Sequence, residues 1–153
     1  LFRSIPSTLK KANNTNQSIP KYVKEIKTVN IDGMAITTGP YKKMQNAGLK
    51  DAHHIYQDAA VRELDGYSKY DALTVQIQGP ANKVGTPHYI ATQAQRVGGS
   101  GTLGIERNIA YKSLRKSGFS VEQAKYLVRE ADKYFEDLGY NLYSLTRRPG
   151  NRK

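Results

Sequence analysis

Two of the three histidines in this chain stand side by side, at His53 and His54, with a carboxylate just before them at Asp51. The third, His88, lies in the segment Gly85-Thr86-Pro87-His88-Tyr89. Neutral imidazole binds Zn, Ni and related ions, whereas carboxylate favours Mg or Mn, and histidine also exchanges a proton near neutral pH. These residue types therefore indicate metal binding or acid–base catalysis, although spacing alone equally fits histidines that only pack or cap.

The two adjacent histidines could perform different tasks. Neighbouring residues of an extended backbone point to opposite faces, so His53 and His54 on a strand would direct their rings apart. Hydrolysis of a phosphodiester uses such a division, with one group on a metal and another activating water. We therefore expect the rest of the chain to hold these imidazoles together and to bring a polyanion to them.

The composition favours a polyanionic partner. The 153 residues suit one domain and include 24 Lys and Arg against 13 Asp and Glu, a formal charge of +11. Clustered cations gain affinity for nucleic acids by releasing counterions from phosphates, although charge alone also fits an ordinary basic surface. The absence of cysteine excludes disulfides, thiolate metal sites and a cysteine nucleophile. No apolar run approaches the ~20 residues that cross a bilayer, and the missing initiator Met indicates a fragment of a larger protein.

The first half of the chain predicts a short antiparallel hairpin and small elements around the histidine pair. Residues 1–25 read as a linker or loosely ordered arm, and 26–153 as the functional domain. Asp32-Gly33 suits the turn of a hairpin over 29–36, which Gly39-Pro40 then breaks. Short helices are predicted over 41–47 and 55–64, and the alternation from Leu73 to Gln78 predicts a half-buried strand.

The second half predicts three helices. Thr86 as N-cap and Pro87 in the first turn begin a helix that runs to about Val97 and carries His88. A basic helix over 103–116 places Arg107, Lys112, Arg115 and Lys116 mostly outside. A capping box of Ser120 and Gln123 begins the clearest helix, over 121–138, with one continuous apolar stripe.

The histidine pair carries a resemblance to a known family. The segment Asp51-Ala52-His53-His54-Ile55 resembles the Ala-His-His signature of AHH nucleases, which belong to the HNH/endonuclease VII group. Further similarity extends over about two thirds of the chain, through Gly79-Pro80, residues 85–89, Glu106-Arg107 and residues 148–152. The resemblance implies an α+β fold with a ββα-metal nuclease core, a short antiparallel hairpin and additional C-terminal helices. Such domains occur as C-terminal toxins of Rhs-repeat and contact-dependent inhibition proteins.

The same resemblance implies roles for individual residues. His53 and His88 would bind a divalent metal with Asp51 as a possible further ligand, and His54 would be the general base. Asn82 corresponds to the middle Asn of the HNH pattern, and Arg96 is a candidate for gripping the phosphate. Where many relatives carry two histidines on the metal helix, this chain has one, so the missing ligand could be Asp51, Gln93, Glu106 or water. The metal could be Mg, Mn, Zn or Ni.

The function expected from these observations is a metal-dependent, non-specific endonuclease that acts on DNA as a secreted toxin domain. Its basic helix residues Arg107, Lys112, Arg115 and Lys116 would hold the phosphate backbone. The expected partner is an acidic immunity protein, and the expected site of action of the monomeric domain is the cytoplasm of a target cell. Two alternatives stay open: a ribonuclease, perhaps of tRNA, that uses His54 and His88 without metal, and a non-catalytic nucleic-acid-binding module.

Overall fold

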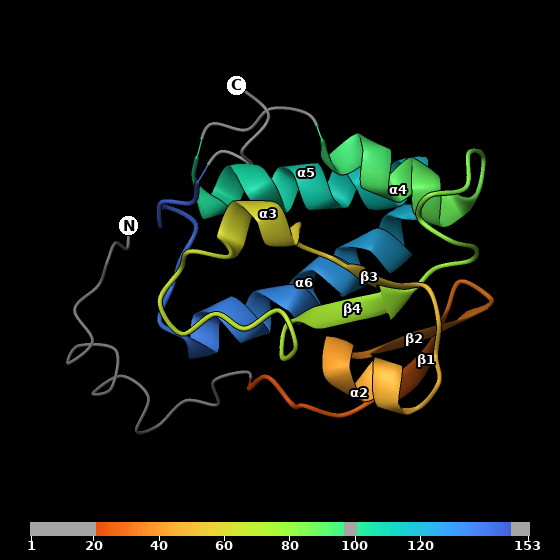
Figure 1. Ribbon diagram of the computed structural model, residues 1–153, viewed down its shortest axis with the longest axis horizontal. Coiled ribbons are helices and arrows are strands. Elements are labelled where there is room, and N and C mark those ends of the chain that lie inside the picture. Colours follow the sequence, from red (N-terminus) through yellow and green to blue (C-terminus); the bar gives the residue numbers. More distant parts are fainter. Residues whose placement is uncertain (1–20, 97–100, 148–153) are drawn as a thin grey trace.

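A computed structural model describes residues 21–96 and 101–147, so residues 1–20 of the predicted arm lie outside the described part of the chain. Figure 1 shows a small sheet with the three later helices grouped beside it and one short helix, residues 41–46, lying apart from them against the strands. The elements in chain order are β1 (Lys27–Ile31), β2 (Met34–Pro40), α2 (Tyr41–Asn46), β3 (Ala52–His54), α3 (Asp58–Val61), β4 (Leu73–Gln76), α4 (Pro87–Gln95), α5 (Leu103–Lys116) and α6 (Val121–Asp137).

The four strands form one antiparallel sheet in the order β1-β2-β4-β3. The predicted hairpin turn is confirmed, because Asp32 and Gly33 both have positive φ, 52° and 80°, as a type I′ turn requires. The predicted break at Gly39-Pro40 is wrong. Both residues continue β2 and pair with β4, and the Thr74 hydroxyl donates to the Gly39 carbonyl at 2.8 Å.

Strands β3 and β4 and helix α4 form a ββα unit that contains all three histidines (Figure 1). Ile55 extends the pairing beyond β3, since its amide donates to the Leu73 carbonyl at 3.3 Å. The helix predicted over 55–64 is therefore wrong in extent: only Asp58–Val61 is helical. Tertiary pairing overrides the helical pattern of this short apolar stretch.

The three later helices follow their predicted signals. Thr86 caps α4 by accepting from the Tyr89 amide at 3.1 Å, with proline in the first turn. Both bonds of the Ser120–Gln123 capping box are present at the start of α6. The stripe of α6 is buried, with Leu127 fully inaccessible, and packs against α5 and β4. Burial of this apolar stripe stabilises the packing of α6 against α5 and the sheet.

The predicted α+β class, with a ββα core, a short hairpin and C-terminal helices, is confirmed. Within the stretch assigned to the arm, Tyr22 contacts the body of the domain: its amide donates to Asp137 and its hydroxyl to the Asp71 carbonyl. Among residues 21–96 and 101–147, no helix is both long and apolar enough to span a bilayer.

Candidate active site

Strand β3 directs its two histidines to opposite sides. His53 is buried, and its ring meets that of His88 edge-on, with 5.2 Å between centroids. His54 is half-buried and lies beside Tyr41, with 4.9 Å between ring centroids. The alternation expected along an extended backbone thus places one imidazole against α4 and the other against the start of α2.

The first turn of α4 fixes the orientation of His88. Its Nδ1 lies 3.0 Å from the Gly79 carbonyl oxygen, which can only accept, so Nδ1 carries the proton and Nε2 keeps its lone pair. Gly79 has φ of +85°, and a Cβ there would lie 2.7 Å from Thr86. Only glycine fits both that backbone conformation and that approach, so the Gly79-Pro80 turn serves to hold this ring.

Gln95, in the last turn of α4, joins the helix to β3. Its amide nitrogen lies 3.1 Å from each of three acceptors: the His54 carbonyl, the Ile55 carbonyl and Nε2 of His53. Since the carbonyls can only accept, the atom facing them is the NH₂ group. Nε2 of His53 therefore bears a lone pair. Burial, followed by the neighbouring His88 and His54, lowers the pKa of His53 to about 3, which keeps the ring neutral.

His54 is arranged as a proton acceptor. Its Nε2 lies 2.8 Å from the Lys69 carbonyl oxygen, so Nε2 carries the proton and Nδ1 presents a lone pair. Burial lowers the pKa of His54, although the bond to Lys69 opposes that effect. A neutral imidazole with a fixed tautomer is the form that a general base requires.

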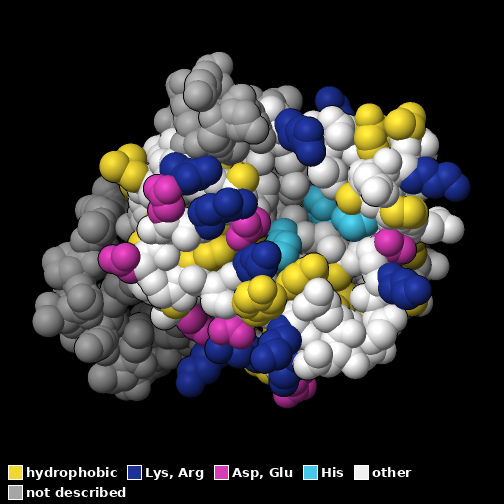
Figure 2. All heavy atoms as spheres, viewed as in Figure 1, with side chains coloured by type: hydrophobic (Ala, Val, Ile, Leu, Met, Phe, Trp, Pro, Cys, Tyr) yellow, Lys and Arg dark blue, Asp and Glu magenta, His cyan; other side chains and the backbone are white. Residues whose placement is uncertain are grey.

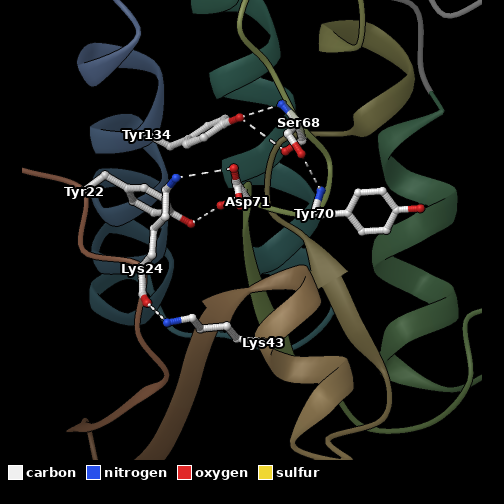
Figure 3. A network of polar contacts seen from close by, with 7 residues as sticks. All are labelled: Tyr22, Lys24, Lys43, Ser68, Tyr70, Asp71 and Tyr134. Carbon is white, nitrogen blue, oxygen red and sulfur yellow. Dashed lines mark hydrogen bonds and ion pairs between the residues drawn. The ribbon is translucent and has the colours of Figure 1, made fainter.

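The loop that supplies the Lys69 carbonyl is held at two points, Ser68 and Asp71 (Figure 3). The Ser68 amide donates to the Tyr134 hydroxyl at 2.7 Å, and the Tyr22 hydroxyl donates to the Asp71 carbonyl. Helix α6 and the segment before β1 therefore fix the loop whose backbone orients His54.

A hollow of about 510 Å³ opens beside His88. It is lined by residues of α2, of the loop before β3 and of the turn after β4, among them Tyr41, Gln45, Lys50, Asp51, Ala81 and His88. Figure 2 shows the histidine side chains near the centre of one face, with Lys and Arg side chains around them. The hollow thus leaves space next to His88, between α2 and the turn after β4.

The structure does not gather the other predicted metal ligands around His53 and His88. Among residues 21–96 and 101–147, no three or more His, Asp or Glu side chains are placed to hold one metal ion. Asp51 borders the hollow with φ of +65°, and its carbonyl accepts from the Ile77 amide. Gln93 is exposed. Glu106 is buried and accepts from the Gln57 amide at 2.6 Å.

The remaining predicted residues lie on the surface or in ion pairs. Asn82 is exposed in the turn after β4, and Arg96 is exposed at the C-cap of α4. Arg107 forms an ion pair with Asp132, in which Nε and Nη2 donate to Oδ2 at 2.9 and 2.8 Å and Nε also lies 3.1 Å from Oδ1. The other three basic residues of α5 are exposed: Lys112, Arg115 and Lys116. Arg115 also donates to the Phe119 carbonyl.

Two groups of the site were not predicted from the sequence. Gln95 lies seven residues after His88, two helical turns along the same face of α4, a spacing that could have identified it. Lys69 acts through its backbone carbonyl, so its side-chain type carries no signal. Its role depends on the fold of the loop.

Comparison with known proteins identifies one related family. A family model described as an HNH/Endo VII superfamily toxin with a SHH signature matches residues 47–136. The match includes β3, β4 and α4, and Ala52 stands before the two histidines where that signature has Ser. No curated protein and no solved structure matches the chain.

The role of Gln95 can be tested by removing its amide. We expect Gln95→Leu to lower the free energy of unfolding by about 1–3 kcal/mol, because the carbonyls of His54 and Ile55 lose a buried donor. Gln93→Leu, exposed on the same helix, should change it by less than about 0.5 kcal/mol. Urea denaturation of the two variants provides the comparison, and equal losses would show that the amide contributes nothing specific.

Proposed function

The chain belongs to the family of HNH/Endo VII superfamily toxins with a SHH signature, and from this membership we propose a metal-dependent, non-specific endonuclease that acts on DNA. Membership supports the general assignment, a nuclease toxin. One observation supports the metal-dependent mechanism: β3 presents His53 to His88 on one side and His54, with its own fixed tautomer, on the other. A hydrolase that uses a metal and a separate base needs that separation.

The two buried imidazoles fit a divalent metal. Nε2 of His88 bears a lone pair because Nδ1 is bonded to Gly79, an outer contact typical of metal-bound histidine. Nε2 of His53 also bears a lone pair. Although it faces the Gln95 amide, that amide has two hydrogens and three acceptors. It can therefore satisfy both carbonyls while His53 binds an ion. Two imidazoles favour Zn or Ni over Mg or Mn.

The bound ion would polarise the scissile phosphodiester as a Lewis acid. His54 would take the proton of the attacking water at Nδ1, while the Lys69 carbonyl stabilises the imidazolium through Nε2–H. Lys50 borders the hollow and would contact backbone phosphates, as would the exposed residues Lys112 and Lys116. Phosphate contacts carry affinity without sequence information, which suits a non-specific toxin.

Nicking of supercoiled plasmid tests this proposal. We expect cleavage that a chelator abolishes and that added divalent ions restore, with Zn or Ni more effective than Mg because the ligands are imidazoles. Intact plasmid under Mg, Mn, Zn and Ni would contradict the DNase assignment. Cleavage of RNA in the presence of chelator would instead support the metal-independent ribonuclease.

Alanine at His53 and alanine at His54 should impair the activity for different reasons. His54→Ala should lower the rate by roughly 10²–10⁴-fold with metal affinity nearly intact, and added metal should not restore it. His53→Ala and His88→Ala should weaken metal binding, so that added metal recovers part of the activity. Metal titrations of the three variants distinguish these outcomes. Rescue of His54→Ala alone would reverse the roles, and unchanged binding and toxicity in His54→Ala would support a non-catalytic module.

We further propose that the domain is delivered as part of a larger secreted protein of the Rhs or contact-dependent inhibition type and acts as a monomer in the target cytoplasm. A producer of such a nuclease needs protection, and the +11 charge favours an acidic immunity protein over the basic face. We expect its association rate to fall steeply as salt rises, as stopped-flow mixing would measure. A rate independent of salt would argue against electrostatic recognition of this face.

A further inference from the structure

Three aromatic rings form a row that begins at the proposed general base. The Tyr41 ring lies 4.9 Å from the His54 ring and 6.3 Å from the Tyr70 ring, measured between centroids, with tilts of 39° and 35°. Tyr41 lines the hollow beside His88, and Tyr70 is 48% exposed. The row therefore leads from the reaction centre to an exposed aromatic face.

The backbone on both sides holds these rings in place. The Tyr41 amide donates to the Ala72 carbonyl at 3.2 Å, and the Lys42 amide donates to the Tyr70 carbonyl at 2.9 Å. The Tyr70 amide donates to the Ser68 hydroxyl, within the loop that α6 supports. Figure 3 shows the Tyr70 ring directed away from the rest of this network. The loop that orients His54 thus also presents the Tyr70 ring.

The Tyr70 side chain makes fewer contacts within the fold than the tyrosines near it. Tyr134 is buried, and Tyr67 is partly buried against the core; both donate their hydroxyls within the fold. The Tyr70 hydroxyl makes no hydrogen bond within residues 21–96 and 101–147, and its ring contacts there are Tyr41 and the Lys69 ammonium, 5.3 Å from its centroid. An exposed contact of this cation–π kind is weak. A nucleobase stacks on an aromatic ring more strongly and would displace the ammonium toward a phosphate.

We propose that Tyr70, supported by Tyr41, is a stacking platform for a base close to the scissile phosphate, and that the preferred substrate is single-stranded or locally unpaired DNA. The inference rests on the nuclease function proposed above. A base within a duplex has both faces covered by its neighbours, so a ring can stack on it only after it is unpaired or flipped out. Lys69, whose ammonium lies over the Tyr70 ring, and Lys50, which lines the same hollow as Tyr41, supply cations near the row.

Cleavage of one 20-nucleotide sequence, as a single strand and as a duplex, tests the platform. We expect the wild-type protein to cleave the single strand faster. Tyr70→Ala should lower kcat/KM on the single strand by roughly 5- to 100-fold and change duplex cleavage much less. Tyr70→Phe should retain the wild-type ratio, since stacking needs the ring and not the hydroxyl. Tyr143→Ala, at an exposed tyrosine of a different hollow, should also retain it.

The platform is contradicted if the wild-type protein prefers the duplex or if Tyr70→Ala keeps the wild-type ratio. Tyr70-dependent cleavage confined to RNA of the same sequence would overturn DNA as the substrate. A binding measurement separates the platform from the nuclease function: in chelator, a single strand carrying 2-aminopurine should be quenched by wild-type protein and Tyr70→Phe but not by Tyr70→Ala. Equal quenching by all three overturns the platform even if DNA is cleaved. Loss of quenching in Tyr70→Ala alone supports the platform even if no DNA is cleaved.

Discussion

The pairing of β3 with β4 determines which imidazole meets which environment. In this register His53 lies opposite Val75 and His54 opposite Thr74. Because side chains alternate along a strand, a slip of one residue would exchange the two histidines between the α4 side and the α2 side. A strand of three residues fixes its register weakly by itself. The Gln95 amide, which binds the carbonyls of His54 and Ile55, adds a second constraint from the helix.

Backbone carbonyls and burial together set the chemical state of the site. The Gly79 carbonyl fixes the tautomer of His88 and the Lys69 carbonyl fixes that of His54. Burial lowers the pKa of both His53 and His54, so both rings are neutral near pH 7. A neutral ring can bind a metal or accept a proton, and a protonated ring can do neither. The tautomers at the site therefore depend on two backbone carbonyls, those of Gly79 and Lys69.

Local signals in the sequence predicted the elements that local chemistry determines. The Asp32-Gly33 turn, the Thr86 cap and the Ser120–Gln123 capping box each depend on residues a few positions apart. The position of His88 in the first turn of a helix followed from the same reasoning, whereas the strand that carries His53 and His54 was considered without a local signal for it. The prediction of a helix over 55–64 was wrong because Ile55 pairs with the start of β4. The prediction of a break at Gly39-Pro40 was wrong because β4 also pairs with β2. The first pairing joins Ile55 to Leu73, 18 positions away, and the second joins Gly39 to Thr74, 35 positions away, so no local pattern records either of them.

The sequence shows where the cations are but not which of them are already paired in the fold. Sequence reasoning assigned phosphate binding to the basic face of α5, but its Arg107 is held by Asp132 on α6. A partly buried ion pair with several hydrogen bonds is stronger than an exposed one, so a phosphate would have to compete with Asp132 for this arginine. Lys50 and Lys69 lie close to the histidines, and Lys69 forms no ion pair among the described residues. Positive charge close to the histidines therefore comes from the loops before β3 and β4, the second of which also orients His54.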